Sequence, residues 1–334
     1  MLERCGRAGK TNEIEIMRII GTGSALPDKI VTNDMLTGFL DTSDSWIRTR
    51  TGIESRRILS TGTLRDLAYD AAVAAMESAG IRGSKIDYVI CSNVANSYVT
   101  PSLSSILLGR LGCKCPCVDL NAACAGFLYA LDIAESFIKT KRAKNILIIC
   151  AEEPTRFCNW HERETSVLFG DGAGAVVVTE GDNLLGIRVT ADTHTDVLYY
   201  KRSMERTPYD RVEERTTPLV MIGREVFRLA VHASIKDIDT ILQECKLTSD
   251  DIDLFLLHQA NLRIIGSIRE HLGQPKDKFP TNMERYGNTS SASIPILMDE
   301  LVREGTLKDG QRILLSAFGG GFVTGAAIMN WSKI

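Results

Sequence analysis

The sequence has no long apolar run, no excess of basic residues and no targeting segment. Within its 334 residues no apolar stretch approaches the roughly 18 residues that a membrane-spanning helix needs, and the amino terminus lacks the apolar core of a signal peptide. The net charge of -3 provides no basic surface for nucleic acid. These absences argue against membrane and nucleic-acid partners and predict a cytoplasmic globular protein.

The cysteines form neither a disulfide framework nor a typical metal pattern. There are nine, an odd number scattered along a chain whose length allows a large core, and this usage is typical of a reducing compartment. Cys113, Cys115 and Cys117 form a C-x-C-x-C run, whereas structural zinc sites use C-x2-C pairs with a distant second pair. We therefore expect no metal site.

The sequence does contain an alternation of strand and helix patterns. Residues 1–13 are polar and patternless, which predicts a disordered extension. The GTGSALP segment is interpreted as a turn, and residues 166–178 as a hairpin and not a phosphate loop, because a strand follows its GDGAGA run. The other elements predicted in the first half are a strand at 14–21, a helix at 64–79, a strand at 88–91, a helix from about 123 to 141 and a strand at 146–150.

The second half of the chain repeats the first. IDYVICSNVAN at 86–96 aligns with IDLFLLHQAN at 252–261, and each segment follows a helix and a short turn. At the same offset KNILIICA aligns with QRILLSAF, and the helix that starts near Ala123 aligns with GNTSSASIP. We expect two similar halves, 14–180 and 181–334, in an α/β fold whose helices enclose mixed sheets. The two aligned helix starts would face each other across a pseudo-twofold axis.

Cys124 lies where the chain turns from a strand into a helix. The strand is predicted at 117–120 as a short buried one, and small residues surround the cysteine. Unpaired N–H groups and the helix macrodipole at such a turn lower the pKa of a thiol. Cys124 is therefore a candidate nucleophile. The alternative is a small buried hydrophobic residue, which most free cysteines are.

Three further groups follow strands or occupy turns in the second half. His258 comes directly after an apolar strand, Asn288 lies in the turn RYGNTS, and AFGGGF at 317–322 follows another strand. Open α/β sheets place ligands at strand ends, and a glycine run lets backbone N–H groups approach an oxyanion. Each feature also has a structural explanation, as a core histidine, a turn or cap residue, and a tight turn.

Four of these segments together resemble the active-site motifs of the β-ketoacyl-acyl carrier protein synthase III family. They are DLNAACAGF, LLHQANLRII, RYGNTSSASIP and AFGGGF, and the segments DTSDSWIRTRTGI and VLFGDGAGA resemble further motifs of the family. The resemblance covers nearly the whole chain. It implies the thiolase fold, a five-layered αβαβα duplication, and a homodimer.

The resemblance also implies a condensing enzyme that initiates fatty acid synthesis. Cys124 would attack acyl-CoA, and the N–H groups of Cys124 and Gly320 would form the oxyanion hole. His258 and Asn288 would then donate hydrogen bonds to the thioester of malonyl-acyl carrier protein as CO2 leaves. Acyl-CoA would be a substrate, and no cofactor is expected. The alternative is a related acyltransferase or ketosynthase of secondary metabolism with the same triad.

The resemblance further implies which residues contact the substrates. Residues implied for CoA are Trp46, Arg50, Arg163 and Asn261, and those implied for the carrier protein are Arg228, Arg263 and Arg269. The acyl pocket would be lined by Phe318 and, from the partner subunit, by a residue at or near position 100. Thr100 is smaller than the Phe that some members carry, which predicts primers longer or more branched than acetyl. As an alternative, Thr100 is an ordinary loop residue held extended by the following proline.

Overall fold

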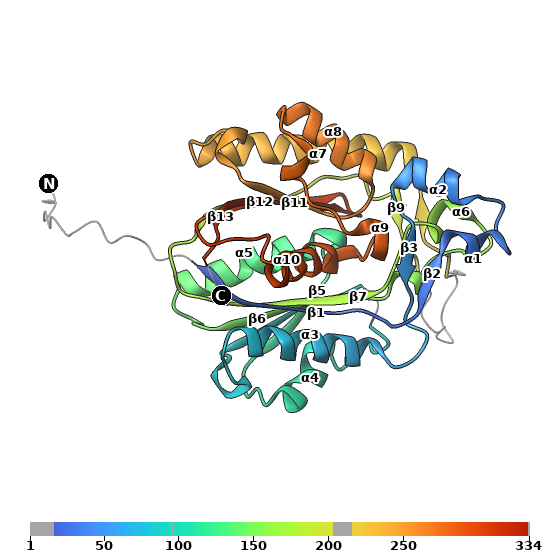
Figure 1. The fold of residues 1–334 in the computed structure, drawn as a ribbon. Helices are drawn as coiled ribbons and strands as arrows, with labels where there is room; N and C mark the ends of the chain where they lie inside the picture. Colours follow the sequence, from blue (N-terminus) through green and yellow to red (C-terminus); the bar gives the residue numbers. More distant parts are fainter. Residues whose placement is uncertain (1–16, 95, 203–215, 333–334) are drawn as a thin grey trace, which may run out of the picture.

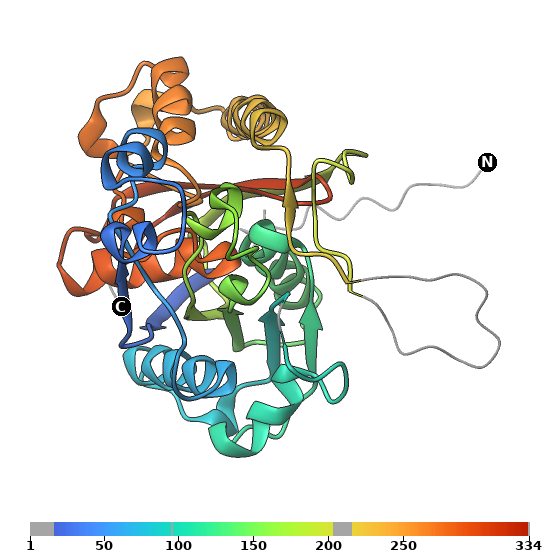
Figure 2. The ribbon, with the colours of Figure 1, turned by 90° about the vertical axis from the view of Figure 1, so that its right-hand side faces the viewer.

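Two β-sheets and three layers of helices build the protein. The computed structural model describes residues 17–94, 96–202 and 216–332. One sheet is covered on its outer face by one helix pair, the other sheet by a second pair, and a third pair lies between the sheets (Figures 1 and 2). The outer pairs are α3 (Leu64–Ser78) with α4 (Leu103–Leu111) and α7 (Gly223–Glu244) with α8 (Leu262–Leu272), and the central pair is α5 (Gly126–Lys139) with α10 (Ser293–Arg303).

The first sheet contains all its strands before residue 180 and has the order β1-β7-β6-β4-β5. The strands β6, β4 and β5 run parallel, whereas β7 is antiparallel to both β6 and β1. The bounds are β1 Arg18–Ala25, β4 Tyr88–Ser92, β5 Cys117–Leu120, β6 Ile146–Glu152 and β7 Gly172–Thr179. At one edge of this sheet, β4 is the only strand among the described residues that pairs with β5.

The second sheet repeats this arrangement in the order β8-β13-β12-β11. Its strands β11 and β12 are parallel, and β13 is antiparallel to both β12 and β8, as for the equivalent strands of the first sheet. The bounds are β8 Leu184–Ala191, β11 Leu254–Leu257, β12 Arg312–Gly319 and β13 Val323–Asn330. The predicted duplication and the αβαβα layers of the thiolase fold are confirmed. The boundary at residues 180 and 181 stays a prediction, and the extension at 1–13 lies outside the described residues.

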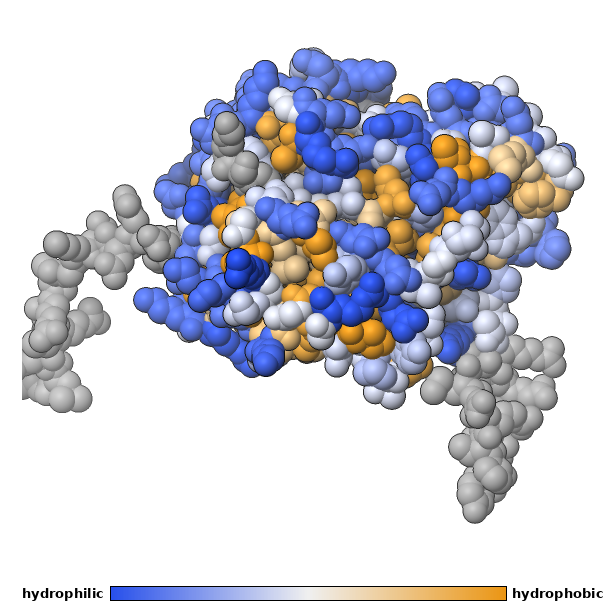
Figure 3. Space-filling model, turned by 60° about the horizontal axis from the view of Figure 1, so that its bottom comes forward, coloured by the Kyte–Doolittle hydropathy of each residue, from blue (hydrophilic) through white to orange (hydrophobic). Residues whose placement is uncertain are grey.

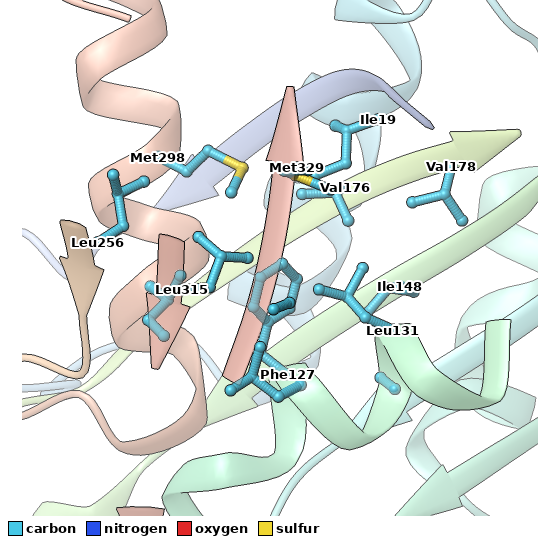
Figure 4. Close-up of a cluster of buried hydrophobic side chains, with 14 of the residues drawn as sticks. Ile19, Phe127, Leu131, Ile148, Val176, Val178, Leu256, Met298, Leu315 and Met329 are labelled. Carbon is cyan, nitrogen blue, oxygen red and sulfur yellow. The ribbon is translucent and has the colours of Figure 1, made fainter. Parts of the chain in front are cut away.

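The central helices are buried because apolar side chains of both sheets close on them. Phe127 and Leu131 of α5 lie with Ile148, Val176 and Val178 of the first sheet and with residues of the second sheet and of α10 (Figure 4). The helix α5 packs against β6 and also against β8, and α10 packs against β1, β7 and β11. Packing against both sheets holds the two central helices in place. The candidate site lies at the amino-terminal ends of these helices.

Short elements form a cap beside one end of the layers (Figure 1). The strands β2 (Ile30–Thr32) and β3 (Ser55–Arg57) pair antiparallel across the two helices that separate them in the chain. The cap also contains α1 (Asn33–Thr37), α2 (Asp44–Thr51), α6 (Arg163–Ser166), α9 (Met283–Tyr286) and the pair β9 (Leu198–Tyr199) with β10 (Val220–Met221). Seen from the side of α3 and α4, the surface intersperses apolar residues among hydrophilic ones (Figure 3).

The helix predicted at 64–79 and the strands predicted at 88–91 and 146–150 are confirmed as α3, β4 and β6, within two residues. The turn predicted in GTGSALP is wrong, because β1 continues through these glycines to Ala25. A Cβ at Gly21 or Gly23 would lie within 2.4 Å of the backbone oxygen of Ala75 or Ala71 in α3. The glycines therefore serve close strand–helix packing and not a turn.

Two further predictions are corrected. The hairpin at 166–178 is wrong, because β7 begins only at Gly172 and the residues before it form α6 and an irregular segment. In that segment Asp171 is buried and accepts hydrogen bonds from the backbone N–H groups of Leu59 and Thr155. The strand at 117–120 has the predicted bounds but is not buried: it is an edge strand with Val118 38% exposed. Its exposed edge is where the sheet ends.

Candidate active site

Two adjoining cavities meet at Cys124. The first has a volume of about 520 Å³ and is lined by Cys124, His258 and Asn288 together with residues of α2, α7 and α8. The second has a volume of about 700 Å³, and Cys124 lines it as well. The structure thus brings the three predicted catalytic residues, from distant parts of the chain, to one cavity.

A single 3-10 turn, η2 (Ala123–Ala125), holds Cys124 between β5 and α5. Ala123 has φ 43°, a conformation that residues other than glycine seldom adopt, and its N–H is bound by the Asn121 side-chain oxygen at 3.1 Å. The end of β12 passes close by: a Cβ at Gly319 would lie 2.7 Å from the Cys124 nitrogen. Only glycine at 319 allows this approach without a shift.

The predicted lowering of the Cys124 pKa is wrong. Burial raises the pKa of this thiol to about 12, although the Ser290 side chain and the backbone N–H act in the opposite direction. Cys124 lies at the helix start as predicted, and removal of the thiolate from water is the largest influence on its pKa. At neutral pH the thiol keeps its proton unless another group accepts it.

His258 follows β11 and is held in one orientation. Its ring Nδ1 lies 2.7 Å from the Ser293 hydroxyl, which also accepts a long hydrogen bond of 3.4 Å from the Gln259 backbone N–H. Burial lowers the pKa of His258 to about 3, so the ring is neutral. When Ser293 donates its proton to Nδ1, the ring proton lies on Nε2. That atom is buried and has no partner among the described residues, so it is a free donor.

Asn288 is fixed by the turn before α10. Its backbone N–H donates to the Leu168 carbonyl at 2.8 Å, and its carbonyl accepts from the Gly170 N–H at 3.1 Å. The side-chain oxygen accepts from the Ser290 N–H at 2.8 Å. Since this partner is a donor, the oxygen faces it, and the amide NH2 group is left for the cavity that Asn288 lines.

The residues predicted to contact CoA gather at the first cavity. The guanidinium groups of Arg50 and Arg163 each lie over the ring of Trp46 in α2, 4.5 Å from its centre. Asn261 caps α8 by accepting from the Arg263 N–H at 2.9 Å. All five residues line the same cavity as Cys124.

Other predicted residues lie elsewhere. Gly320 lines the second cavity, and Phe318 lines the first, with its ring edge-on to His258 at 5.2 Å. Thr100 is exposed and lines neither cavity within its own chain.

Of the three arginines predicted for the carrier protein, Arg263 lines the first cavity and the other two do not. Arg263 lies at the cavity over the ring of Phe227. Arg228 pairs with Glu225 at 2.9 Å, and Arg269 with Glu270 at 3.7 Å, both away from the cavity. The guanidinium groups of Arg228 and Arg269 therefore each have an acidic neighbour.

Sequence reasoning missed Ser290, Ser293 and Glu152. The two serines belong to the TSSAS run, and Glu152 is the acidic end of the otherwise apolar β6, which is the one sequence feature that could have drawn attention to it. Among the described residues no cluster of His, Cys, Asp or Glu could hold a metal ion. In the same part of the chain no helix has the length and apolarity to cross a membrane.

Comparison with known proteins places this geometry in one family. The family model for 3-oxoacyl-[acyl-carrier-protein] synthase III matches residues 118–196, and the model for the C terminal of that synthase matches residues 242–331. The beta-ketoacyl-[acyl-carrier-protein] synthase III of Xanthomonas campestris pv. campestris is 42% identical over 318 residues, which are 94% of this chain and 98% of the relative. The corresponding protein of Clostridium acetobutylicum is 40% identical over 95% of this chain and 99% of its own.

Solved structures give the same result. The crystal structure of 3-oxoacyl-[acyl-carrier-protein] synthase III from Aquifex aeolicus has a TM-score of 0.89 at 39% identity, and the match covers 94% of this chain and 100% of that one. The priming β-ketosynthase of a polyketide biosynthetic pathway has a TM-score of 0.90 at 34% identity, with 98% and 99% covered. Sequence identity over almost the whole length, and not the fold alone, decides the assignment. The chain belongs to the 3-oxoacyl-[acyl-carrier-protein] synthase III family.

Proposed function

We propose that this chain initiates fatty acid synthesis by condensing an acyl-CoA with malonyl-acyl carrier protein through an acyl-cysteine intermediate. The observation that carries the proposal is the convergence of Cys124, His258 and Asn288 on one cavity. Membership of the synthase III family supports the same reaction. No cofactor is required, because decarboxylation itself generates the carbanion and acyl-CoA is a substrate.

In the first half-reaction the Cys124 sulfur attacks the acyl-CoA thioester. The oxyanion that forms is bound by backbone N–H groups of Cys124 and Gly320, and oxyanion donors of this kind are worth about 10²–10³ in rate. Gly319 supports this assignment, since its lack of a side chain lets β12 approach the backbone of Cys124. CoA leaves, and the acyl group stays on the sulfur.

In the second half-reaction the thioester carbonyl of malonyl-acyl carrier protein lies between His258 and Asn288. The Nε2–H of the neutral histidine and the NH2 group of the asparagine donate to this carbonyl oxygen as CO2 leaves, which stabilises the enolate. Both donors are supported by partners that occupy their other ends, Ser293 and the Ser290 N–H. The enolate carbon then attacks the acyl-cysteine, and the cysteine sulfur leaves.

The entrance to the first cavity supports CoA binding. The CoA adenine stacks against Trp46 and Arg163, Arg50 binds a phosphate, and Asn261 contacts the pantetheine arm. Carrier protein binding is proposed for Arg228, Arg263 and Arg269, two of which pair with glutamates in this structure.

A homodimer is proposed from the exposed edge of the first sheet. Val118 of β5 is 38% exposed, and the loop after β4 presents Tyr98 at 44% and Val99 at 74%. Apolar side chains on an unpaired strand edge are typical of a surface that another chain covers. Thr100 belongs to this loop, so a second copy would bring it to the acyl pocket of its partner. A cytoplasmic location stays a prediction.

Secondary metabolism is the second candidate. The likeness to a priming β-ketosynthase of a polyketide pathway, at 34% identity over 98% of this chain, favours it specifically. The two candidates share the triad chemistry and differ in the acyl carrier protein that supplies the malonyl group.

The test is to incubate the protein with an acyl-CoA and malonyl-acyl carrier protein and to detect the ketoacyl product by mass spectrometry. Carrier proteins of fatty acid and of polyketide synthesis are compared in parallel, with Cys124→Ala as the inactive control. Product with either carrier supports the condensation and identifies the pathway. If neither carrier yields product while Cys124 becomes acylated, the malonyl half of the proposal is wrong.

A further inference from the structure

Glu152 is a buried carboxyl beside the nucleophile that the condensation, as derived from the triad, does not use. It ends β6, has none of its surface exposed and lines the second cavity with Cys124. Its oxygens accept from the Ser291 hydroxyl at 2.6 Å and from the Val94 backbone N–H at 3.1 Å. A buried carboxyl usually has a basic partner. No ion pair of Glu152 with a basic side chain occurs within the described part of the chain.

Ser290 lies between Glu152 and Cys124. It is the first residue of the 3-10 turn η6 (Ser290–Ala292), it is buried, and it lines the same cavity as both groups. Its side chain is near enough to both groups to lower the pKa of the Cys124 thiol and that of the Glu152 carboxyl, and η6 packs against both η2 and β6. A hydroxyl has one donor and two acceptor sites, so it can accept from the thiol while it donates to the carboxylate.

We propose that Glu152 is the proton acceptor for the Cys124 thiol and that the Ser290 hydroxyl transfers the proton between them. The inference rests on the proposed function, because it assigns a step of the same reaction. His258, the other base at the site, is unsuited to accept this proton, because its Nδ1 is occupied by Ser293 and burial lowers the pKa of its ring to about 3.

Atoms and charges balance in this step. The S–H bond of Cys124 breaks as its proton moves to the Ser290 oxygen, and the Ser290 O–H proton moves to the Glu152 carboxylate. The sulfur electron pair forms a bond to the acyl carbon of acyl-CoA, and the carbon–sulfur bond to CoA then breaks. The departing CoA thiolate takes the proton back from Glu152 through Ser290. The products are acyl-Cys124, free CoA thiol and the original carboxylate, with no oxidant or reductant.

The surroundings of Glu152 suit an acceptor that works near neutral pH. Burial raises its pKa to about 7, and general bases work best when their pKa lies near the working pH. The other titratable groups that face it are thiols: Cys124 of η2, Cys91 of β4 and Cys150 of β6 itself. Burial raises the pKa of all three, so Glu152 titrates before any of them.

The experiment measures the rate at which Cys124 reacts, as a function of pH from about 5 to about 10. Iodoacetamide reports on the thiol without any substrate, acetyl-CoA and isobutyryl-CoA report on acylation, and peptide mapping identifies the modified cysteine. In the wild type we expect alkylation to rise with pH around a midpoint near 7. Glu152→Gln should lower both rates at neutral pH by about 10²-fold and move the rise to the pH at which the thiol itself ionises.

Two further variants separate the relay from a loss of folding or of charge. Ser290→Ala keeps the buried carboxyl and should show the same loss as Glu152→Gln. Glu153→Gln removes the next carboxylate, which pairs with Arg156, and should keep the wild-type profile. A wild-type rate and pH profile in Glu152→Gln or in Ser290→Ala overturns the proposal. Normal alkylation of the wild type with no acylation by either acyl-CoA would instead refute the proposed function.

Discussion

Replacement of Gly319 by Ala should damage catalysis through the backbone of the nucleophile. The added methyl carbon would lie 2.7 Å from the Cys124 nitrogen, 2.9 Å from the Ala123 Cβ and 3.2 Å from the Ala125 nitrogen. Packed atoms do not approach so closely, so η2 or β12 must shift. Overpacking of this kind costs about 1–3 kcal/mol. The shift moves the Cys124 N–H away from the oxyanion, and loss of one such donor costs about 10²–10³ in rate.

The assay combines urea unfolding with the rate of acylation by acyl-CoA, followed by mass spectrometry. Gly266→Ala is the matched control, because Gly266 lies inside α8 and a Cβ there meets no atom within 4 Å. We expect this control to gain up to about 1 kcal/mol, since alanine favours a helix over glycine, and to acylate normally. If Gly319→Ala unfolds and acylates as the wild type does, close packing at residue 319 does not hold the nucleophile in place.

Alanine at His258 or Asn288 should spare acylation of the nucleophile and abolish malonyl decarboxylation, measured as CO2 release; equal loss of both steps contradicts this division. For Glu152, a rise in pKa from 4.5 to about 7 on folding amounts to about 3 kcal/mol. The folded protein keeps the proton on Glu152 up to a higher pH than the unfolded chain does, so the wild type loses stability as pH rises from 4.5 to 7. Urea unfolding should therefore show the free energy of unfolding of Glu152→Gln rising relative to that of the wild type over this window. A constant difference between the two argues against this pKa shift. Thr100→Phe should shift preference among acetyl-, butyryl-, isobutyryl- and octanoyl-CoA toward acetyl, and an unchanged order means that Thr100 does not set the pocket depth. Val118→Lys should produce monomers in light scattering, whereas an intact dimer would show that β5 is not the interface.

The sequence was sufficient for much of the fold and for three residues that the structure brings to one cavity. Each element that was placed correctly, such as α3 or β6, has an apolar period that local residues determine. Cys124 and His258 could be placed because each directly follows a strand, and Asn288 because its turn is aligned with the helix start at Cys124. The duplication was visible because both copies keep the same strand pattern.

The errors and omissions arise where distant segments meet. The pKa of Cys124 was predicted in the wrong direction because the depth of burial depends on both sheets and not on the neighbouring residues. Glu152 was missed because the hydroxyl that binds it belongs to Ser291, 139 residues further along the chain. The sequence predicts a turn at the glycines of β1 because their partner, α3, cannot be inferred from the strand itself.

The central helices make the two halves of the chain depend on each other for their stability. Because α5 packs against β8 as well as β6, and α10 against β1 and β7 as well as β11, neither repeat completes its own hydrophobic core. A fragment that ended between the halves would expose one apolar face of its sheet. The repeat is therefore not a unit of folding, and the protein should unfold in one cooperative transition. Cys124, His258 and Asn288 therefore meet at one cavity only when both halves are folded.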